Sequence, residues 1–524
     1  MSADRTAAVE FELDGQPVSV SDGCSLLEAL RDQLGVRGPK DGCSPQGQCG
    51  CCTVLVDGSA RVACVTPAAR VRGRSVTTVD GLEGAERWAA AFTATGASQC
   101  GFCTPGIIAR LSTLSDADLA DSAKVDRALL AHLCRCTGWQ TIHEACDLVV
   151  TGRTPAATAE PSLAAQRAAL EGRAPQLVGP DVALGRGGFA DDSAPLDALV
   201  AVRSPDGSWA VGETLTEARA AAGKVQGRRT TVAPSWPVEL PAGDWDLTLQ
   251  TTWVEPAYLE PDAAWCESGG QPASSLGNGG AFGGKTDTDA GAVARRLADE
   301  HGRSVRVLWS REDVVRYGPK RPPLAIGLRV DGTGVARLAR PAAGSVELPD
   351  AHSLGLPDGV SIEWVDVTGP PVSLDLRGAV WAEVAAAHAV LASTDDSPLV
   401  VRGRSGGEVR AQIEVDDAGA ETVRIEVAAG APLDETVLRS YCIGAAHMAI
   451  GMVRSESLSV DDQGEPHDLT IRSFGVLRAV DTPTIDVVIE SSDDEPVVAS
   501  DAVFAAVLAA AWREAGLAGR WPVG

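Results

Sequence analysis

Cysteine is the residue type whose spacing in this chain points most clearly to chemistry. Eight of the 13 cysteines fall into two sets of four within the first 140 residues. The first set lies in GCSPQGQCGCCTVLVDGSARVAC and comprises Cys43, Cys49, Cys52 and Cys64. The second set lies in QCGFCTPG and LCRCTGW and comprises Cys100, Cys103, Cys134 and Cys136. Because four thiolates can hold one metal centre, the spacing predicts two metal centres.

Iron–sulfur clusters and zinc ions both use four cysteine ligands, and the gaps between the cysteines help to separate them. The first set has the spacing C-x5-C-x2-C-x11-C, one residue longer in its first gap than plant-type ferredoxins. The second set has the spacing C-x2-C-x30-C-x-C. Zinc sites usually pair two C-x2-C units, and the closing C-x-C fits that pattern poorly. The spacing therefore favours two [2Fe-2S] clusters over two zinc sites.

Length and charge limit the remaining possibilities. A chain of 524 residues is too long for one ordinary core, so several domains are expected. The net charge of -26 argues against nucleic acid and anionic membrane surfaces as partners. We find no secretory signal and no apolar run long enough to span a membrane. Cysteines in such a chain are expected to be metal ligands rather than disulfides, in a cytoplasmic protein.

The elements around the cysteines predict two small domains. Residues 8–20 alternate apolar and polar about Asp14-Gly15, which predicts a β-hairpin, and Ser25 is a plausible N-cap for a helix to residue 34. With short strands after the first cysteines, this predicts a β-grasp, ferredoxin-like domain over residues 1–82. Residues 83–152 are expected to form a helical bundle, with helices at 86–95, 105–114, 124–133 and 141–150.

The rest of the chain is expected to be α+β. Residues 153–176, rich in Ala, Pro and Thr, are predicted to be a linker. Strands near residues 199 and 209 and a helix from 214 to 225 suggest a small unit over 177–240. A larger α+β domain is expected over 241–524, with helices at 290–301, 435–452 and 502–515.

Both cysteine sets resemble the iron–sulfur part of the molybdenum hydroxylases, the xanthine oxidase family. The family pattern of GC, CGxCTV, a lone Cys, QCGFCTPG and LCRCTGY is matched across residues 8–150, with Trp139 in place of the usual Tyr. The resemblance implies a bundle cluster nearer the molybdenum cofactor and a β-grasp cluster nearer the electron exit. It also implies that Gln99 contacts the pterin of that cofactor.

A glycine-rich stretch in the second half allows two interpretations. GGAFGGKT, at residues 279–286, satisfies the Walker A pattern of a P-loop NTPase. The preceding QPASSLG is not the buried apolar strand that a P-loop follows, and no Walker B strand is evident. The same stretch resembles the GGGFGGK motif of the family's molybdenum-binding subunit, which implies that Gly280, Phe282 and Gly283 approach the metal.

Other segments resemble the same molybdenum-binding subunit but depart from it. TTWVEPAYLEP resembles a family segment ending in Leu259, Glu260 and Pro261, with Pro256 where the family has His. The family's subunit is also far longer than the part of this chain that follows residue 153. The family's catalytic carboxylate lies in a GxGE-P motif, whose only counterpart is Asp494-Glu495-Pro496. Glu495 is therefore the candidate base, and a solvated acidic loop is the alternative.

Three functions follow from these patterns. The leading interpretation is an oxidoreductase that passes electrons from a substrate-oxidising molybdenum centre, through two [2Fe-2S] clusters, to an external acceptor. The second is a non-catalytic electron-transfer subunit whose C-terminal half is a docking scaffold, and the third is an NTPase. No segment resembles a flavin domain, so the resemblance implies a separate flavin subunit or another acceptor as partner. A separate full-length molybdenum subunit is a further expected partner, and the substrate is not readable.

Overall fold

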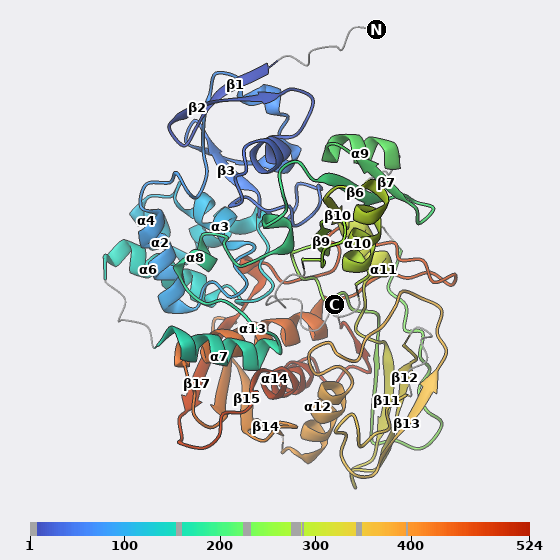
Figure 1. The fold of residues 1–524 in the computed structure, drawn as a ribbon. Helices are drawn as coiled ribbons and strands as arrows, with labels where there is room; N and C mark the ends of the chain where they lie inside the picture. Colours follow the sequence, from blue (N-terminus) through green and yellow to red (C-terminus); the bar gives the residue numbers. More distant parts are fainter. Residues whose placement is uncertain are drawn as a thin grey trace.

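The computed structural model describes residues 8–153, 160–223, 232–273, 285, 288–341, 348–394 and 397–523. The α+β class expected from the sequence is confirmed. Figure 1 shows the N-terminal sheet at one end, a helical region and a second small sheet in the middle, and the C-terminal sheets and helices at the other end. The two predicted cysteine sets lie in the first two of these parts.

The N-terminal sheet has the strand order β2-β1-β5-β3-β4. The predicted hairpin is present, with Asp14 and Gly15 both at positive φ in its turn. Ser25 begins the helix as predicted, because its Oγ accepts a hydrogen bond from the Glu28 amide at 3.1 Å. The helical elements and strands are α1 (Leu26–Glu28), a π-helical turn (Ala29–Gln33), β1 (Ala8–Leu13), β2 (Gln16–Ser21), β3 (Thr53–Val56), β4 (Ser59–Val62) and β5 (Ser75–Thr77).

The helical region packs directly against the loop that carries the first cysteines. Its helices are α2 (Ala85–Thr95), α3 (Thr104–Leu111), α4 (Asp116–Leu119), α5 (Ser122–Ala128) and α6 (Gln140–Thr151). Pro105 lies in the first turn of α3, where its missing N–H costs no hydrogen bond. A Cβ at Gly106 would overlap the carbonyl of Gly50. Glycine at position 106 therefore lets the two cysteine-bearing parts meet backbone to backbone.

The segment predicted as a linker contains a helix, α7 (Pro161–Gly172). Its Arg167 is fully buried and donates hydrogen bonds to the carbonyls of Pro432 at 2.8 Å and Val497 at 2.9 Å. Its Glu171 forms an ion pair with Arg167 at 3.1 Å and accepts the Ser500 amide at 2.9 Å. Residue composition predicted a linker because it does not show that these two charged side chains are buried. Their backbone partners lie more than 200 residues further along the chain.

The second small sheet has the strand order β7-β6-β10-β9. Its strands are β6 (Leu199–Arg203), β7 (Trp209–Gly212), β9 (Ala263–Cys266) and β10 (Val305–Leu308), and the helices α9 (Leu215–Ala222) and α10 (Ala290–His301) pack against them. The short helix α11 (Arg311–Tyr317) follows β10, whereas α8 (Pro180–Ala183) packs against α2 of the helical region. The predicted domain boundary at residue 240 falls between strands of this one sheet. The difference arises because β10 pairs in parallel with β6, a contact between distant segments that no local pattern records.

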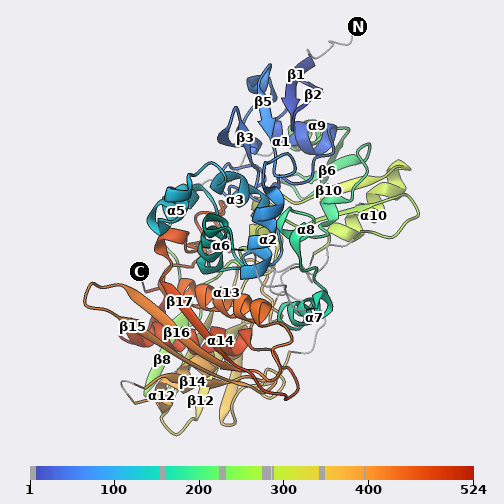
Figure 2. The ribbon, with the colours of Figure 1, turned by 90° about the vertical axis from the view of Figure 1, so that its left-hand side faces the viewer.

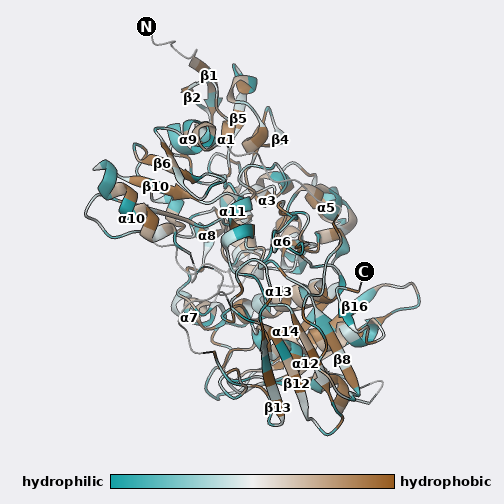
Figure 3. Ribbon diagram, turned by 90° about the vertical axis from the view of Figure 1, so that its right-hand side faces the viewer, coloured by the Kyte–Doolittle hydropathy of each residue, from teal (hydrophilic) through white to brown (hydrophobic). Residues whose placement is uncertain are grey.

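The C-terminal part consists of two sheets with helices against them, and hydrophobic segments, brown in Figure 3, run through its strands and helices. One sheet is β13-β12-β11-β8-β18 and the other is β14-β15-β16-β17. The strands are β8 (Leu247–Thr251), β11 (Leu324–Leu328), β12 (Gly334–Ala339), β13 (Val360–Val365), β14 (Leu399–Arg402), β15 (Glu408–Val415), β16 (Glu421–Ala428), β17 (Thr484–Glu490) and β18 (Arg520–Trp521). The helices are α12 (Trp381–Ala392), α13 (Glu435–Arg454) and α14 (Ser500–Glu514).

Helix α13 lies between the helical region and the C-terminal sheets in both views (Figures 1 and 2). It is the one helix of the described residues that is long and apolar enough to cross a membrane, but 89% of its apolar window is buried inside the protein. Its apolar composition is thus explained by packing in a core. This buried helix therefore connects the helical region, which carries the second cysteine set, to the C-terminal sheets.

The buried Arg167–Glu171 pair predicts a large cost when only one partner is removed. Arg167→Met leaves the Glu171 carboxylate buried without its cation, so we expect unfolding to be easier by about 3–5 kcal/mol. The measurement is the urea dependence of the C-terminal tryptophan fluorescence. Arg296→Met is the matched control, since Arg296 and Glu300 form the same i,i+4 pair on an exposed helix face. Equal effects of the two substitutions would contradict this reasoning.

Candidate metal centres

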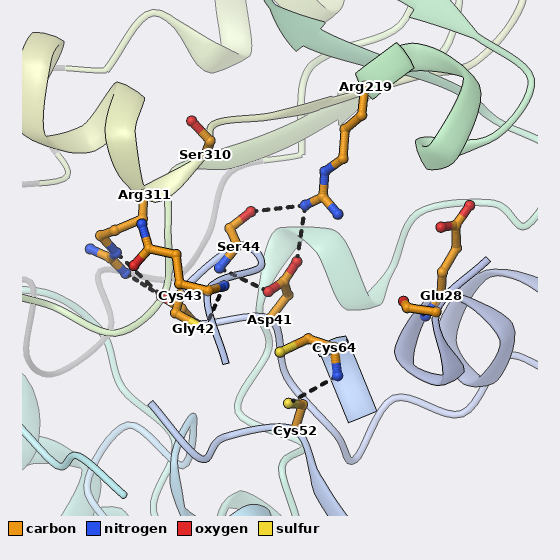
Figure 4. A network of polar contacts seen from close by, with 12 residues as sticks. Glu28, Asp41, Gly42, Cys43, Ser44, Cys52, Cys64, Arg219, Ser310 and Arg311 are labelled. Carbon is orange, nitrogen blue, oxygen red and sulfur yellow. Dashed lines mark hydrogen bonds and ion pairs between the residues drawn. The ribbon is translucent and has the colours of Figure 1, made fainter. Parts of the chain in front are cut away.

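The first cysteine set forms a buried nest of sulfur atoms. The backbone amides of Gln46 and Gln48 point at Cys43 Sγ, at 3.2 and 3.5 Å. The Cys64 amide points at Cys52 Sγ at 3.4 Å, as Figure 4 shows. Hydrogen bonds from the thiols of Cys49 and Cys64, and then from nearby backbone amides, hold the pKa of the Cys43 thiol well below its usual range. The same contact raises the pKa of the Cys49 thiol well above its usual range, so Cys43 is the sulfur favoured as thiolate, the form that binds metal.

The glycines of this loop are required by its backbone. Gly50 has φ +74, and a Cβ there would overlap the ring of His132 from the helical region. The His132 ring is buried and lies 3.1 Å from the Thr53 hydroxyl. The loop therefore turns tightly enough to aim amides at sulfur and still leaves room for its neighbour.

The second cysteine set brings its thiols together in pairs. Cys136 Sγ lies 3.6 Å from Cys100 Sγ. Cys103 donates to Cys134, and this contact, followed by the Thr137 hydroxyl at 3.0 Å, lowers the pKa of the Cys134 thiol to about 6. Pairs of close sulfurs suit a two-iron cluster, in which two cysteines bind each iron. Across the described ranges, no three His, Cys, Asp or Glu side chains converge as a single ion would need.

The two cysteine sets are joined by one backbone hydrogen bond. The amide of Leu133, the residue before Cys134, donates to the carbonyl of Cys49 at 3.0 Å. Cys51 is buried at the same place, and burial raises the pKa of its thiol. A neutral thiol there acts as a small apolar filler. The path from Cys49 through Leu133 to Cys134 thus crosses one hydrogen bond, and all three residues are buried.

Gln99 lies at the contact between the second cysteine set and α13. Its Nε2 donates to the Cys136 carbonyl and to the Ser440 hydroxyl, both at 2.9 Å, and its buried Oε1 has no hydrogen-bond partner. A Cβ at Gly444 would overlap the Cys136 carbonyl, so α13 touches the backbone of a predicted ligand. The sequence predicted both Gln99 and a helix over 435–452, but not the contact between them, for which the small residues in YCIGAAHMAIG were the available signal.

A buried ion pair ties the second cysteine set to the C-terminal part. Arg135, between Cys134 and Cys136, donates to both carboxylate oxygens of Glu456 at 2.5 and 2.7 Å and to the Pro256 carbonyl at 2.9 Å. These residues line a small cavity together with Glu255, whose carboxylate is buried 3.0 Å from the Lys320 ammonium. Glu255 was not predicted from the sequence, because the family segment was matched at Glu260, five residues later.

The other predicted site residues are not brought to this place by the described structure. Gly280, Phe282 and Gly283 lie outside the described residues. Lys285, from the same stretch, has its ammonium 3.0 Å from Glu260 and 3.4 Å from Asp262, both buried carboxylates. Its charge is therefore neutralised within the protein, whereas a P-loop lysine must face phosphate. Glu495 lies on an exposed loop between β17 and α14, in water rather than in a closed pocket.

Comparisons with known proteins agree with this description. Residues 78–147 match the family described as a [2Fe-2S] binding domain. The xanthine dehydrogenase iron-sulfur-binding subunit of Escherichia coli O157:H7 is 38% identical over 151 residues, covering 27% of this chain and 93% of that protein. The nicotine 6-hydroxylase small subunit of Paenarthrobacter nicotinovorans is 41% identical over 142 residues, covering 26% of this chain and 86% of that protein.

A solved structure resembles the whole chain. The aldehyde oxidoreductase from Desulfovibrio desulfuricans superimposes with a TM-score of 0.71, covering 98% of this chain and 99% of that one. The sequences are 14% identical over that superposition, so the likeness is one of fold. The fold of the second half thus matches the fold expected from its short motifs.

Replacing one ligand of the second cysteine set should affect one signal only. Because Cys134 and Cys136 lie in the second set and Cys49 links to it only through its backbone, we expect Cys134→Ser or Cys136→Ser to remove one of two electron paramagnetic resonance signals of the reduced protein. Cys51→Ser is the control, since that thiol is a filler, and should keep both signals. Two unchanged signals in either ligand variant would refute the assignment.

A buried histidine beside Arg135 predicts a pH dependence of stability. Burial, and then the charge of Arg135, lowers the pKa of His447 to about 3, below the usual value near 6.5. Between these values the unfolded chain binds a proton that the folded chain does not. Stability should therefore fall with decreasing pH below about 6.5, by about 1.4 kcal/mol per pH unit from this group.

The thermal midpoint at pH values from 7 down to 4.5 tests this assignment. His447→Gln should give a shallower decline than wild type, because glutamine keeps a donor for the Leu477 carbonyl that His447 Nε2 contacts at 3.1 Å and does not titrate. His301→Gln, at the exposed end of α10, is the matched control and should follow wild type. Parallel curves for wild type and His447→Gln would show that the histidine does not contribute.

Proposed function

The chain belongs to the molybdenum hydroxylase family through its iron–sulfur part, and we propose that it carries two [2Fe-2S] clusters in series. It is an electron-transferring oxidoreductase of this type. In the proposal, Cys43, Cys49, Cys52 and Cys64 hold the first cluster, and Cys100, Cys103, Cys134 and Cys136 hold the second. The bound clusters supply one-electron redox chemistry, and the protein supplies buried thiolates at a fixed separation.

The hydrogen bond between Leu133 and Cys49 is the single observation that carries this proposal. The carbonyl of Cys49, in the first set, accepts directly from the amide of Leu133, and Leu133 is followed by Cys134 of the second set. Seven of the eight cysteines are buried and Cys100 is partly buried, so the sulfurs are largely shielded from water. Two separate zinc sites would not need such a connection, because zinc does not transfer electrons.

The surroundings of the two sets support a direction of electron flow. The second set lies against α13 and the Arg135–Glu456 pair of the C-terminal half, and its Cys100 is partly buried. The first set is buried but lies directly beside an exposed side chain, since Val65, which follows Cys64, is 56% exposed. We infer that electrons enter at the second cluster and leave from the first to an external acceptor. A flavin-containing subunit is the kind of acceptor that the resemblance implies.

The source of the electrons is the part of the proposal that depends on molybdenum. When bound, a molybdenum cofactor supplies oxidation of substrate. Among the residues described around Gln99, one group suits a pterin, the unsatisfied Gln99 Oε1, while α13 fills the volume next to Cys136. These residues do not form a complete cofactor site, and we assign no step of the electron path to it. Gly280, Phe282, Gly283 and Glu495 remain the candidate residues for such a site.

The packing of α13 and the exposure of Glu495 favour a second candidate function. In it, this chain transfers electrons without oxidising substrate, and a separate full-length molybdenum subunit supplies them. The matching relatives whose names include a subunit or small subunit support partner chains of this kind. A cytoplasmic location, expected from the cysteine content and the N-terminal sequence, is part of both candidates.

Metal analysis of protein expressed in a host that makes the cofactor separates these candidates. Two clusters require about four irons per chain. We expect that iron content, together with two distinct electron paramagnetic resonance signals after dithionite reduction. Molybdenum near one per chain supports substrate oxidation by this chain, and iron without molybdenum supports the electron-transfer subunit. Protein with zinc in place of iron would overturn both.

A further inference from the structure

An acid-free segment stands out in a chain whose net charge is -26. Between residues 58 and 79 there is no Asp or Glu, and there are four arginines, Arg61, Arg70, Arg72 and Arg74. The segment runs through β4, the 3-10 turn Ala63–Val65 that carries Cys64, the 3-10 turn Ala68–Val71, and β5. A local excess of positive charge in so acidic a protein indicates attraction to something negative at this place.

The segment encloses an open surface groove, which we call the arginine groove. It is lined by Val56, Arg61, Val65, Thr66, Pro67, Arg70, Val71 and Arg74. Figure 3 shows β4 at the end of the molecule far from α12 and α14. The groove therefore lies at the β4 end of the molecule.

Two of the groove arginines are not neutralised by acids. Arg74 forms an ion pair with Asp57 at 2.6 Å. Arg61 makes a hydrogen bond to the carbonyl of its neighbour Ala60, and neither Arg61 nor Arg70 has an ion pair with a described residue. Both side chains are exposed. Their positive charges are available to a partner.

The groove lies next to a ligand of the first cysteine set. Val65 forms part of its wall and directly follows Cys64, whose amide donates to Cys52 Sγ. The Val65 side chain also packs closely on Gly47, in the loop between Cys43 and Cys49. An apolar exposed centre with a charged rim, one residue from a cluster ligand, has the composition of a small electron-transfer interface.

We propose that the arginine groove is the docking surface for an acidic one-electron carrier protein, which takes electrons from the first cluster. The inference rests on the proposed function, since it needs a cluster at Cys64. One electron leaves the reduced cluster, the cluster returns to its oxidised level, and the carrier is reduced by one electron, with no bond made or broken. Arg61 and Arg70 steer the carrier, and Val65 makes the central apolar contact. A nucleic acid is a poorer occupant because the groove is lined by no aromatic side chain on which a base could stack.

The test compares two charge reversals of equal size. Arg61→Glu with Arg70→Glu reverses the groove, and Arg296→Glu with Arg402→Glu reverses two exposed arginines on α10 and β14. Dithionite-reduced protein is mixed with ferricyanide, an anionic oxidant, at low ionic strength, and the return of cluster absorbance is followed by stopped flow. Polyglutamate serves as a probe that imitates an acidic carrier surface.

We expect the groove variant to be oxidised by ferricyanide about tenfold more slowly than wild type and the control variant to change much less. Added salt should slow wild type and should not slow the groove variant. Polyglutamate should inhibit wild type and the control but not the groove variant. Equal rates for the two variants, or equal inhibition by polyglutamate, would overturn the proposal.

Iron content and the two paramagnetic signals are measured on every variant. Should the glutamate pair fail to fold, Arg61→Gln with Arg70→Gln removes the charges without reversing them and should give a smaller slowing in the same direction. Wild-type protein that lacks the signals would overturn the proposed function, and this inference with it. Wild-type protein with both signals but no sensitivity to the groove charges would overturn the docking surface alone.

Discussion

Backbone contact at glycine is the constraint on which the rest of this structure depends. Gly106 meets Gly50 and Gly444 meets Cys136, and in each case a side chain on the glycine would overlap the opposite carbonyl. The first contact sets how near the two cysteine loops lie, and the second sets how near α13 lies to the second loop. Larger residues would separate the layers by about the width of a methyl group. Packing at this density leaves little freedom for relative movement of the two sets.

The C-terminal half contributes to this constraint by supplying a wall. Helix α13 covers the second cysteine set, Arg135 reaches into that half to bind Glu456, and Arg311 binds the Gly42 carbonyl next to the first set. A buried arginine–carboxylate pair adds little net stability compared with apolar residues, but it holds one geometry strictly because every other arrangement leaves a charge unpaired. The domain that resembles a catalytic one is thus also the support of the electron path.

Local pattern predicted the first 150 residues well because the information there is local. Ligand spacing, the Ser25 cap, the Asp14-Gly15 turn and the helix beginning near Pro105 each depend on a few neighbouring residues. The pairing of β6 with β10 and the burial of Arg167 and Glu171 depend on partners far away in the chain, and composition cannot record them. Gln99 was identified through its motif, whereas Ser440 and Gly444, which contact its surroundings, are ordinary small helix residues. Glu495 was predicted from a short motif match alone. Such a match does not show whether a residue is buried, and Glu495 is exposed.

The position of α13 also bears on the order of events during biosynthesis. Cys134 and Cys136 are made some 300 residues before the helix that covers them, and both are almost fully buried once it is in place. In the proposal, iron and sulfide therefore reach these thiols before α13 packs on the bundle. A chain that closes first, with an empty site, would have to open its largest core helix to be repaired. With the proposed second cluster, the contact that covers Cys136 thus makes loading an early step of maturation.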